Sequence, residues 1–276
     1  MVTVDSFVRL VLLPVVMLTL AACVVEPAQP YVALPSPDDI RQRTDTVTRQ
    51  PTLNLIPRAD QRIQGDDIAA QYVANYRRRG FAAFENGTDT RFERLKRIFN
   101  DVHARSHLDL ENLSPVLIVK NQFQAYTTGG TIIIFYTGLT ERLNDDELAM
   151  VIGHEIAHLA AGHVAEQSSR DLVNVSVNET QLLGSYSIVN EHEADAVGMV
   201  YATLAGYDPE AAAAIWGALS RDGDERLQLF NATHPSDSAR ARLLSEKAAL
   251  IKDLRGAVGW KALRHCNPIY CASDTR

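Results

Sequence analysis

Residues 145–158 read DDELAMVIGHEIAH. Apolar side chains occur nearly all the way round the helix that this stretch predicts, which is typical of a helix buried inside a protein. His154 and His158 are four residues apart, so both imidazoles project from one side, about 40° apart. Glu155 lies about 100° from His154, within reach of a metal-bound water without being a ligand itself. Two histidines and a glutamate in a buried helix are costly unless they are paired or bind a metal.

The next predicted helix carries candidates for a third ligand. Zinc catalysis uses three protein ligands and one open position. The metzincin pattern requires a glycine at position 161 and a histidine at position 164, where Ala161 and Val164 stand, so that class is excluded. Glu191 and Asp195 are four residues apart and share a helix face, so one can ligate while the other hydrogen-bonds a ligating histidine. The alternatives are a structural histidine pair and a solvated acidic patch.

Three motifs in order resemble one peptidase family. His154-Glu155-x-x-His158, then Glu191-x-x-Ala194-Asp195, then Thr233-His234-Pro235 with Arg240, are similar to the family of HtpX and the CAAX prenyl protease (family M48), over roughly residues 60–250. The resemblance implies an α+β, mostly helical, minimal gluzincin (zincin-like) metalloprotease domain, with a small β-sheet whose edge strand lines the active-site cleft. It also implies one zinc ion per chain at His154, His158 and Glu191, with Glu155 as the general base.

The roles of two further residues follow from the same resemblance. His234 would face the zinc, where it either stabilises the developing oxyanion or takes the fourth zinc position in a latent state; beside Pro235 it is alternatively a helix-start residue. Arg240 would orient the site or merely cap a helix surface. The remaining histidines are given no role in the site: His103, His107, His163, His192 and His265.

The N-terminal segment favours export and lipidation. Residues 10–22 form an apolar run that is too short to span a membrane and suits a signal-peptide core. The run ends in Leu-Ala-Ala-Cys23, which resembles the lipobox of bacterial lipoproteins, the alternative being a cleaved secretory signal that happens to end in cysteine. Val24 follows Cys23 where inner-membrane lipoproteins have an aspartate, so the prediction is a periplasmic protein, lipid-anchored at the outer membrane.

Composition divides the rest of the chain. Residues 24–57 hold six of the eleven prolines and predict a tether. The predicted domains are a signal peptide (1–22), the lipidated cysteine with its tether (23–58), the metallopeptidase domain (59–256) and a tail (257–276) with a disulfide between Cys266 and Cys271. The net charge of −7, without a basic stripe, argues against nucleic acid as a partner.

Periodicity predicts a helical domain with a few strands. Helices are expected over 63–79, 90–105, 145–164, 180–205, 208–220 and 236–255, and strands over 116–122, 123–128 and 131–137. Gly129-Gly130 predicts a turn between two adjacent strands. The stretch between His158 and Glu191 is too polar to cross a bilayer, so the expected relatives are the soluble periplasmic or lipoprotein members of the family.

The predicted function is a zinc endopeptidase for unfolded or misassembled cell-envelope proteins. The substrate would lie extended along the edge strand near Tyr126 to Gly130 and pair with it main chain to main chain. Two rivals remain: a lipoprotein that binds envelope proteins and uses zinc for structure, and an exopeptidase that trims short peptides. The intact Glu155 argues against the first, since a structural zinc site does not need that carboxylate.

Overall fold

The computed structural model describes residues 54, 56–174, 186–219, 234 and 238–257, all of which belong to one compact unit. Several predictions lie outside these residues: the signal peptide, the lipidation site at Cys23, nearly all of the tether, and the disulfide between Cys266 and Cys271.

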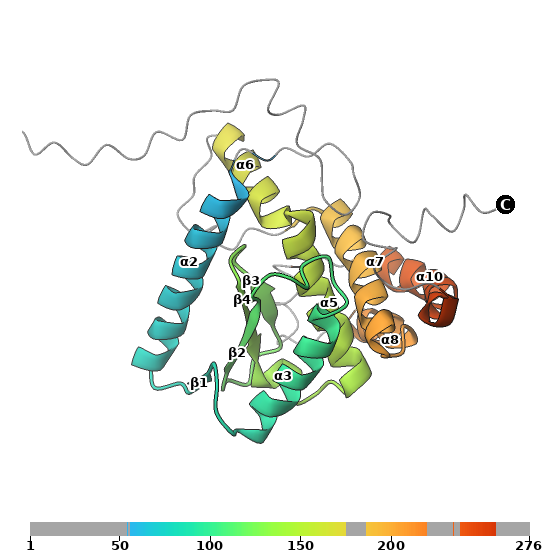
Figure 1. Ribbon diagram of the computed structural model, residues 1–276, viewed down its shortest axis with the longest axis horizontal. Helices are drawn as coiled ribbons and strands as arrows, with labels where there is room; N and C mark the ends of the chain where they lie inside the picture. Colours follow the sequence, from blue (N-terminus) through green and yellow to red (C-terminus); the bar gives the residue numbers. More distant parts are fainter. Residues whose placement is uncertain (1–53, 55, 175–185, 220–233, 235–237, 258–276) are drawn as a thin grey trace, which may run out of the picture. The chain divides into compact units, whose positions relative to one another are not determined.

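Helices dominate the described chain, and a small sheet lies among them (Figure 1). In chain order the elements are α2 (Arg58–Arg78), β1 (Ala83–Phe84), α3 (Thr90–His103), β2 (Ser114–Ile118), β3 (Ala125–Thr127), β4 (Ile132–Tyr136), α4 (Thr137–Thr140), α5 (Asp145–Ala161), α6 (His163–Asn174), α7 (Ile188–Ala205), α8 (Glu210–Leu219) and α10 (Ser238–Ala257).

The sheet has the strand order β1-β2-β4-β3, with β2 and β4 parallel and the other two pairs antiparallel. The predicted turn between adjacent strands is confirmed, because β3 pairs with β4 across Gly129 and Gly130. Gly129 has φ +89°, a left-handed conformation that glycine adopts without strain. β3 ends the strand order, so it is an edge strand, as the resemblance implied.

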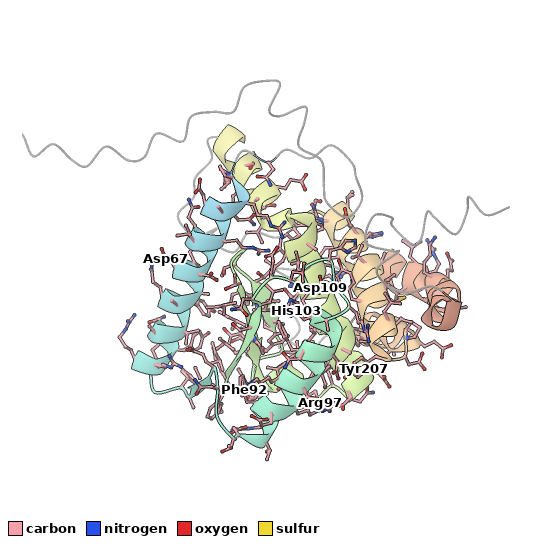
Figure 2. All side chains as sticks on the ribbon, viewed as in Figure 1. Asp67, Phe92, Arg97, His103, Asp109 and Tyr207 are labelled. Atoms are coloured by element: carbon pink, nitrogen blue, oxygen red, sulfur yellow. The ribbon has the colours of Figure 1, made fainter. Side chains whose placement is uncertain are left out.

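Alternate residues of the central strands face two different cores. Val116 and Ile118 of β2 pack with Ile134 of β4 beneath α2, whereas Leu117 of β2 and Phe135 of β4 pack toward α3, α5 and α7. This two-residue alternation is what a sheet covered on both faces requires. Phe92 of α3, labelled in Figure 2, is fully buried in the second core.

Side-chain caps mark the start of two of the predicted helices. Asn144 and Glu147 form a reciprocal capping box at the start of α5, with bonds of 2.9 and 3.0 Å between each side chain and the other residue's amide. The Asp208 side chain accepts from the amide of Glu210 at 3.1 Å, at the start of α8.

Four bounds were wrong by three residues or more. Helix α2 begins at Arg58 and not at 63, and β2 ends at Ile118 and not at 122. Helix α5 ends at Ala161 and not at 164, and α7 begins at Ile188, capped by Ser187, and not at 180. The predictions also missed β1, the short helix α4 and the helix α6.

Glycines let α5 and α7 approach each other closely. A Cβ on Gly198 would lie 2.5 Å from the amide nitrogen of His154, and one on Gly153 would lie 2.4 Å from the carbonyl oxygen of Gly198. Real Cβ atoms do not approach backbone so closely, so each position accepts only glycine unless a helix moves. Gly198 is seven residues after Glu191 and shares its helix face, so this contact sets how near α7 brings Glu191 to the histidines of α5.

A second glycine contact joins α2 to the turn between β3 and β4. A Cβ on Gly65 would lie 2.1 Å from the amide nitrogen of Gly130. Polar bonds fasten the same contact: Arg62 donates to the carbonyls of Gly129 and Gly130 at 3.0 and 2.7 Å, and Thr131 donates its amide to Asp66 at 2.5 Å. Helix α2 therefore fixes one end of the edge strand.

Among the described residues, no single helix is both long enough and apolar enough to cross a membrane. The bent pair formed by Asp145–Ala161 and His163–Ser169 reaches the threshold only when its two members are counted together, by length and composition alone.

Candidate metal centre

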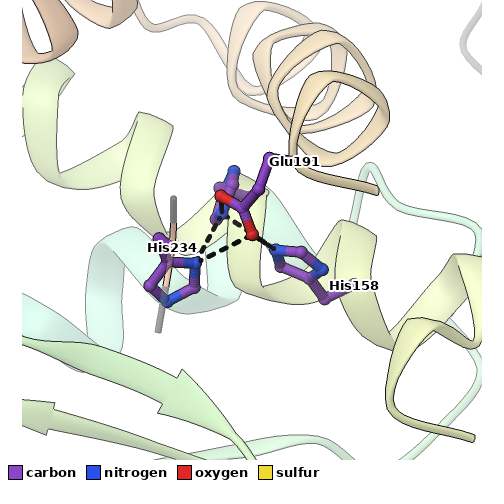
Figure 3. A group of neighbouring side chains, drawn as sticks. His158, Glu191 and His234 are labelled. Atoms are coloured by element: carbon purple, nitrogen blue, oxygen red, sulfur yellow. Dashed lines mark hydrogen bonds and ion pairs between the residues drawn. The ribbon is translucent and has the colours of Figure 1, made fainter. Parts of the chain in front are cut away.

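Four side chains from three parts of the chain converge on one point. His154 and His158 come from α5, Glu191 from α7, and His234 from the segment before α10. One ligand atom from each lies within 4.8 Å of the others, and all four residues are at most 1% exposed. Figure 3 shows His158, Glu191 and His234 directed at one another. The structure thus brings together all three predicted ligands, and His234 with them.

The ring nitrogens of the three histidines lie within hydrogen-bond distance of one another. The Nε2 atoms of His154 and His158 are 2.9 Å apart, and Nε2 of His154 is 3.2 Å from Nδ1 of His234. The Glu191 carboxylate lies 3.3 Å from both His158 Nε2 and His234 Nδ1. A ring nitrogen offers either one N–H or one lone pair, so His154 Nε2 cannot hydrogen-bond to both neighbouring ring nitrogens at once. Three imidazole nitrogens and a carboxylate oxygen fit the ligand set and coordination number of zinc.

Glu155 lies next to this group on α5. Its Oε1 is 3.4 Å from Nε2 of His234, and the residue is fully buried. Burial raises the pKa of the Glu155 carboxyl, although the charges of His234 and His154 oppose the rise. A carboxylate that readily takes up a proton beside a metal site has the property of a general base.

Asp195 and Arg240 lie behind the group, where they contact His154 and Glu191. Asp195 Oδ1 is 2.9 Å from Nδ1 of His154, opposite the ring nitrogen that faces the group. Arg240 donates from Nε and Nη2 to both oxygens of Asp195, at 2.7 and 2.8 Å, and its Nη1 lies 2.8 Å from Oε2 of Glu191. Arg240 is 1% exposed, so it is no surface cap. The bidentate pair fixes the orientation of the Asp195 carboxylate, and the contact from Nη1 joins Glu191 to the same guanidinium.

The electrostatics of the buried carboxylates follow from these contacts. Burial alone would raise the pKa of Glu191, but His234, His158 and His154 together hold it well below its usual value. Burial would likewise raise the pKa of Asp195, and Arg240 with His154 lowers it instead. Both carboxyls are therefore ionised at neutral pH, which a metal ligand and its supporting partner require.

The pKa values of His158 and His234 are shifted in opposite directions, the first by burial and the second by neighbouring carboxylates. Burial holds the pKa of His158 well below its usual value. At His234 burial acts in the same direction, but the carboxylates of Glu191 and Glu155 prevail and raise its pKa.

Two residues near the group were missed by the sequence analysis. Tyr186, just before the N-cap of α7, stacks on the His158 ring with 3.8 Å between centroids and an interplanar angle of 15°. His163, interpreted as having no role in the site, places Nδ1 2.8 Å from Nδ1 of His158. No sequence pattern predicts the position of Tyr186. His163 directly follows Gly162, and a glycine at this place could have predicted the end of the helix.

A mostly helical domain with a small mixed sheet, and a buried His-Glu-x-x-His helix facing a carboxylate of the next long helix, define a metallopeptidase domain of the zincin type. A family model described as Peptidase family M48 matches residues 89–177 and 169–248, more than half of the chain. The chain belongs to this family, which confirms the resemblance.

The chain is also similar to named proteases. It is 33% identical over 163 residues to the Mitochondrial metalloendopeptidase OMA1 of Arabidopsis thaliana, covering 52% of this chain and 33% of the relative. It is 30% identical over 138 residues to the protein of the same name from Schizosaccharomyces pombe, covering 43% of this chain and 41% of the relative. It is 26% identical over 149 residues to Metalloprotease YcaL of Escherichia coli, covering 45% of this chain and 58% of the relative. The chain thus spans between a third and three fifths of these relatives' lengths.

Proposed function

We propose that this chain is a zinc-dependent endopeptidase that hydrolyses peptide bonds in unfolded or misassembled proteins of the cell envelope. The observation that carries the proposal is the position of Glu155, whose carboxylate lies beside a buried group of three imidazoles and one carboxylate. A site that used metal only for structure would have no use for an additional buried carboxylate next to it. The names of the relatives, metalloendopeptidase and metalloprotease, support the same reaction.

The residues divide the work between holding the metal and moving a proton. His154, His158 and Glu191 would hold the ion, and Asp195 with Arg240 would fix their orientation. Zinc in such a site supplies a Lewis acid that polarises the scissile carbonyl and acidifies water. Glu155 would take a proton from the attacking water and return it to the leaving amine.

His234 is proposed to hold the site in a latent state. Its Nδ1 lies among the ligand atoms, and its Nε2 is 3.4 Å from both Glu155 and the carbonyl of Ala125 in β3. In this arrangement His234 contacts both the proposed general base and the edge strand, and every residue of the group is buried. Substrate would enter when the ring moves away, after which the same imidazole can stabilise the developing oxyanion.

The edge strand β3 is proposed to receive the substrate. An extended peptide that added to β3 would pair main chain to main chain, a mode that tolerates many side-chain sequences. Ala125 and Tyr126 are buried in the structure, so this pairing also requires β3 to be uncovered. Only unfolded or misassembled polypeptides offer long extended segments, which is the argument for this substrate class.

The proposed location is the periplasm, with a lipid at Cys23 anchoring the chain to the outer membrane. The support is the sequence Leu-Ala-Ala-Cys23 followed by Val24. Incorporation of labelled fatty acid into the wild-type chain, and its loss in Cys23→Ser, would test the anchor. Separation of inner and outer membranes would then test the location.

The function is tested with full-length protein, its Glu155→Gln variant and its Glu191→Ala variant. The wild type should hold about one zinc per chain and cleave casein at internal bonds. Glu155→Gln should keep the zinc and lose about 10²- to 10⁴-fold in cleavage rate, because only proton transfer is removed. Glu191→Ala should hold zinc weakly. Equal cleavage by wild type and Glu155→Gln would refute the mechanism, and trimming only from chain ends would replace the endopeptidase with an exopeptidase.

A further inference from the structure

The ring of His158 has polar partners on both of its nitrogens. Nε2 faces the metal group, 2.9 Å from His154 Nε2 and 3.3 Å from Glu191. Nδ1 points the other way and lies 2.8 Å from Nδ1 of His163. His158 and His163 are at most 2% exposed, so water does not substitute for this bond.

The tautomers of both rings follow from this geometry. A neutral imidazole carries one N–H, and a ring that ligates through Nε2 carries it on Nδ1. Nδ1–H of His158 then donates to Nδ1 of His163, which must be an acceptor. The proton of His163 consequently lies on Nε2, and that atom is 3.5 Å from Oε2 of Glu193 on α7. The hydrogen-bond series therefore runs from the metal group through His158 to His163, and Nε2 of His163 faces Glu193.

Gly162 is the reason why His163 can reach this position. In one continuous helix a residue five positions after His158 would point about 140° away from it. Gly162 instead has φ +77° and ends α5, and α6 starts at His163 with a bend of 53° between the two helices. The bend places the side chain of His163 behind the His158 ring.

We propose that His163, whose Nδ1 lies 2.8 Å from Nδ1 of His158, is a positioning residue that fixes the tautomer and orientation of the metal ligand His158. It corresponds in role to Asp195, which lies 2.9 Å from the far nitrogen of His154. Ligating histidines generally donate their second N–H to such a partner, and loss of the partner costs about 10- to 100-fold in metal affinity. This inference rests on the metal site of the proposed function.

The test compares zinc affinities of full-length variants, measured by competition with a chromogenic chelator. His163→Phe keeps a ring but removes the acceptor, and zinc affinity should fall about 10- to 100-fold. His163→Gln restores an acceptor oxygen and should recover most of that loss. His107→Phe is the matched control, because His107 Nδ1 lies 2.6 Å from the Tyr201 hydroxyl but His107 is not among the residues of the metal group. Its zinc affinity should equal that of the wild type.

A second measurement covers the case in which His163→Phe does not fold. In ¹⁵N-histidine wild-type protein loaded with zinc, the Nδ1–H of His158 should show a scalar coupling across its hydrogen bond to Nδ1 of His163. Wild-type zinc affinity in folded His163→Phe, or an Nδ1–H of His158 without this coupling, would overturn the positioning role. Failure of the wild type to bind zinc would instead overturn the proposed function, so the two failures are distinguishable.

Discussion

The molecule uses the same contact, glycine against backbone, in two regions that differ in chemistry. In the α5–α7 region, Gly153 and Gly198 bring two helices together, and the space beside them holds an extensively paired group of charged and polar side chains. In the α2–turn region, Gly65 meets Gly130, and hydrogen bonds from Arg62 to backbone carbonyls fasten a strand end. The first region sets distances between ligands, and the second sets the position of a main chain.

The two regions differ in what a displaced residue would cost. Displaced ligands in the α5–α7 region leave buried charges without compensation, which is costly in a low dielectric. A displaced strand in the α2–turn region exposes peptide groups that water can solvate. We therefore expect changes in the first region to remove metal binding and stability together, and changes in the second to weaken substrate binding while zinc is retained.

The largest expected effect is that of Arg240→Leu. This change leaves Glu191 and Asp195 buried without the guanidinium that binds both, and it should destabilise the zinc-free chain by about 3–5 kcal/mol. Urea unfolding monitored by circular dichroism measures the change. Arg240→Lys keeps the charge but not the bidentate geometry, and should lose less. Wild-type stability in Arg240→Leu would mean that these buried ion pairs do not contribute to the free energy of unfolding.

The next effect is that of Gly198→Ala. The added methyl would lie 2.5 Å from the His154 amide, so α5 and α7 must separate, at about 1–3 kcal/mol. Because Glu191 moves with α7, zinc affinity should fall by about tenfold or more. Gly153→Ala, on the facing helix, should behave alike. Unchanged zinc binding in both variants would show that the helix spacing does not set the ligand distances.

Gly65→Ala makes the corresponding change in the α2–turn region. The methyl would lie 2.1 Å from the Gly130 amide, so the turn must shift away from α2. Zinc content should stay at the wild-type value, while the KM for casein rises about tenfold, equivalent to about 1.4 kcal/mol of lost strand binding. Asp67→Ala, exposed on the same helix, is the control. A loss of zinc from Gly65→Ala would break the distinction between the two regions.

The smallest effect belongs to the start of α5, outside both regions. Asp145 lies 2.7 Å from Arg94 and 2.6 Å from Arg97, and these bonds lower its pKa, the bond from Arg97 most. The pairs are partly exposed, so Asp145→Asn should cost about 0.2–1 kcal/mol at pH 7.

The pH dependence of this variant follows from the direction of the pKa shift. A carboxyl whose pKa is lower in the folded than in the unfolded chain stabilises fully above its unfolded pKa of about 3.9. That stabilisation is lost as the pH falls through the folded value, so wild type and Asp145→Asn should converge in acid. Thermal melts from pH 3 to 7, with zinc binding as the control, test this; a difference that grows in acid would contradict it.

The sequence predicted the centre of the site well because helical spacing is local. The i, i+4 relations of His154 with His158, and of Glu191 with Asp195, place each pair on one helix face wherever the helix lies. The three ordered motifs, compared with a known family, then supplied the relation between helices that spacing cannot give. All seven predicted residues of the metal centre meet in the structure, Arg240 as a buried partner of two carboxylates.

The features that the sequence analysis missed depend on where the backbone turns between helices. A helix predicted through residue 164 placed His163 on the wrong side of α5, because the left-handed Gly162 was taken for a helical residue. The position of Tyr186 depends on how the chain enters α7, and no periodicity describes that entry. The two-residue strand β1 is too short to show an alternating pattern.

The separation of the ligands along the chain has a consequence for folding. His154 and His158 are together as soon as one helix forms, but Glu191 and His234 are 43 residues apart and His154 and His234 are 80 apart. Closing such loops costs entropy before any contact repays it, so long-range contacts of this kind form late. A chain emerging from the ribosome with α5 complete still lacks Glu191 and His234, two of the four residues of the group. The complete group therefore exists only after nearly all of the domain has been synthesised and docked, which delays the proposed hydrolytic site until the protein that carries it has folded.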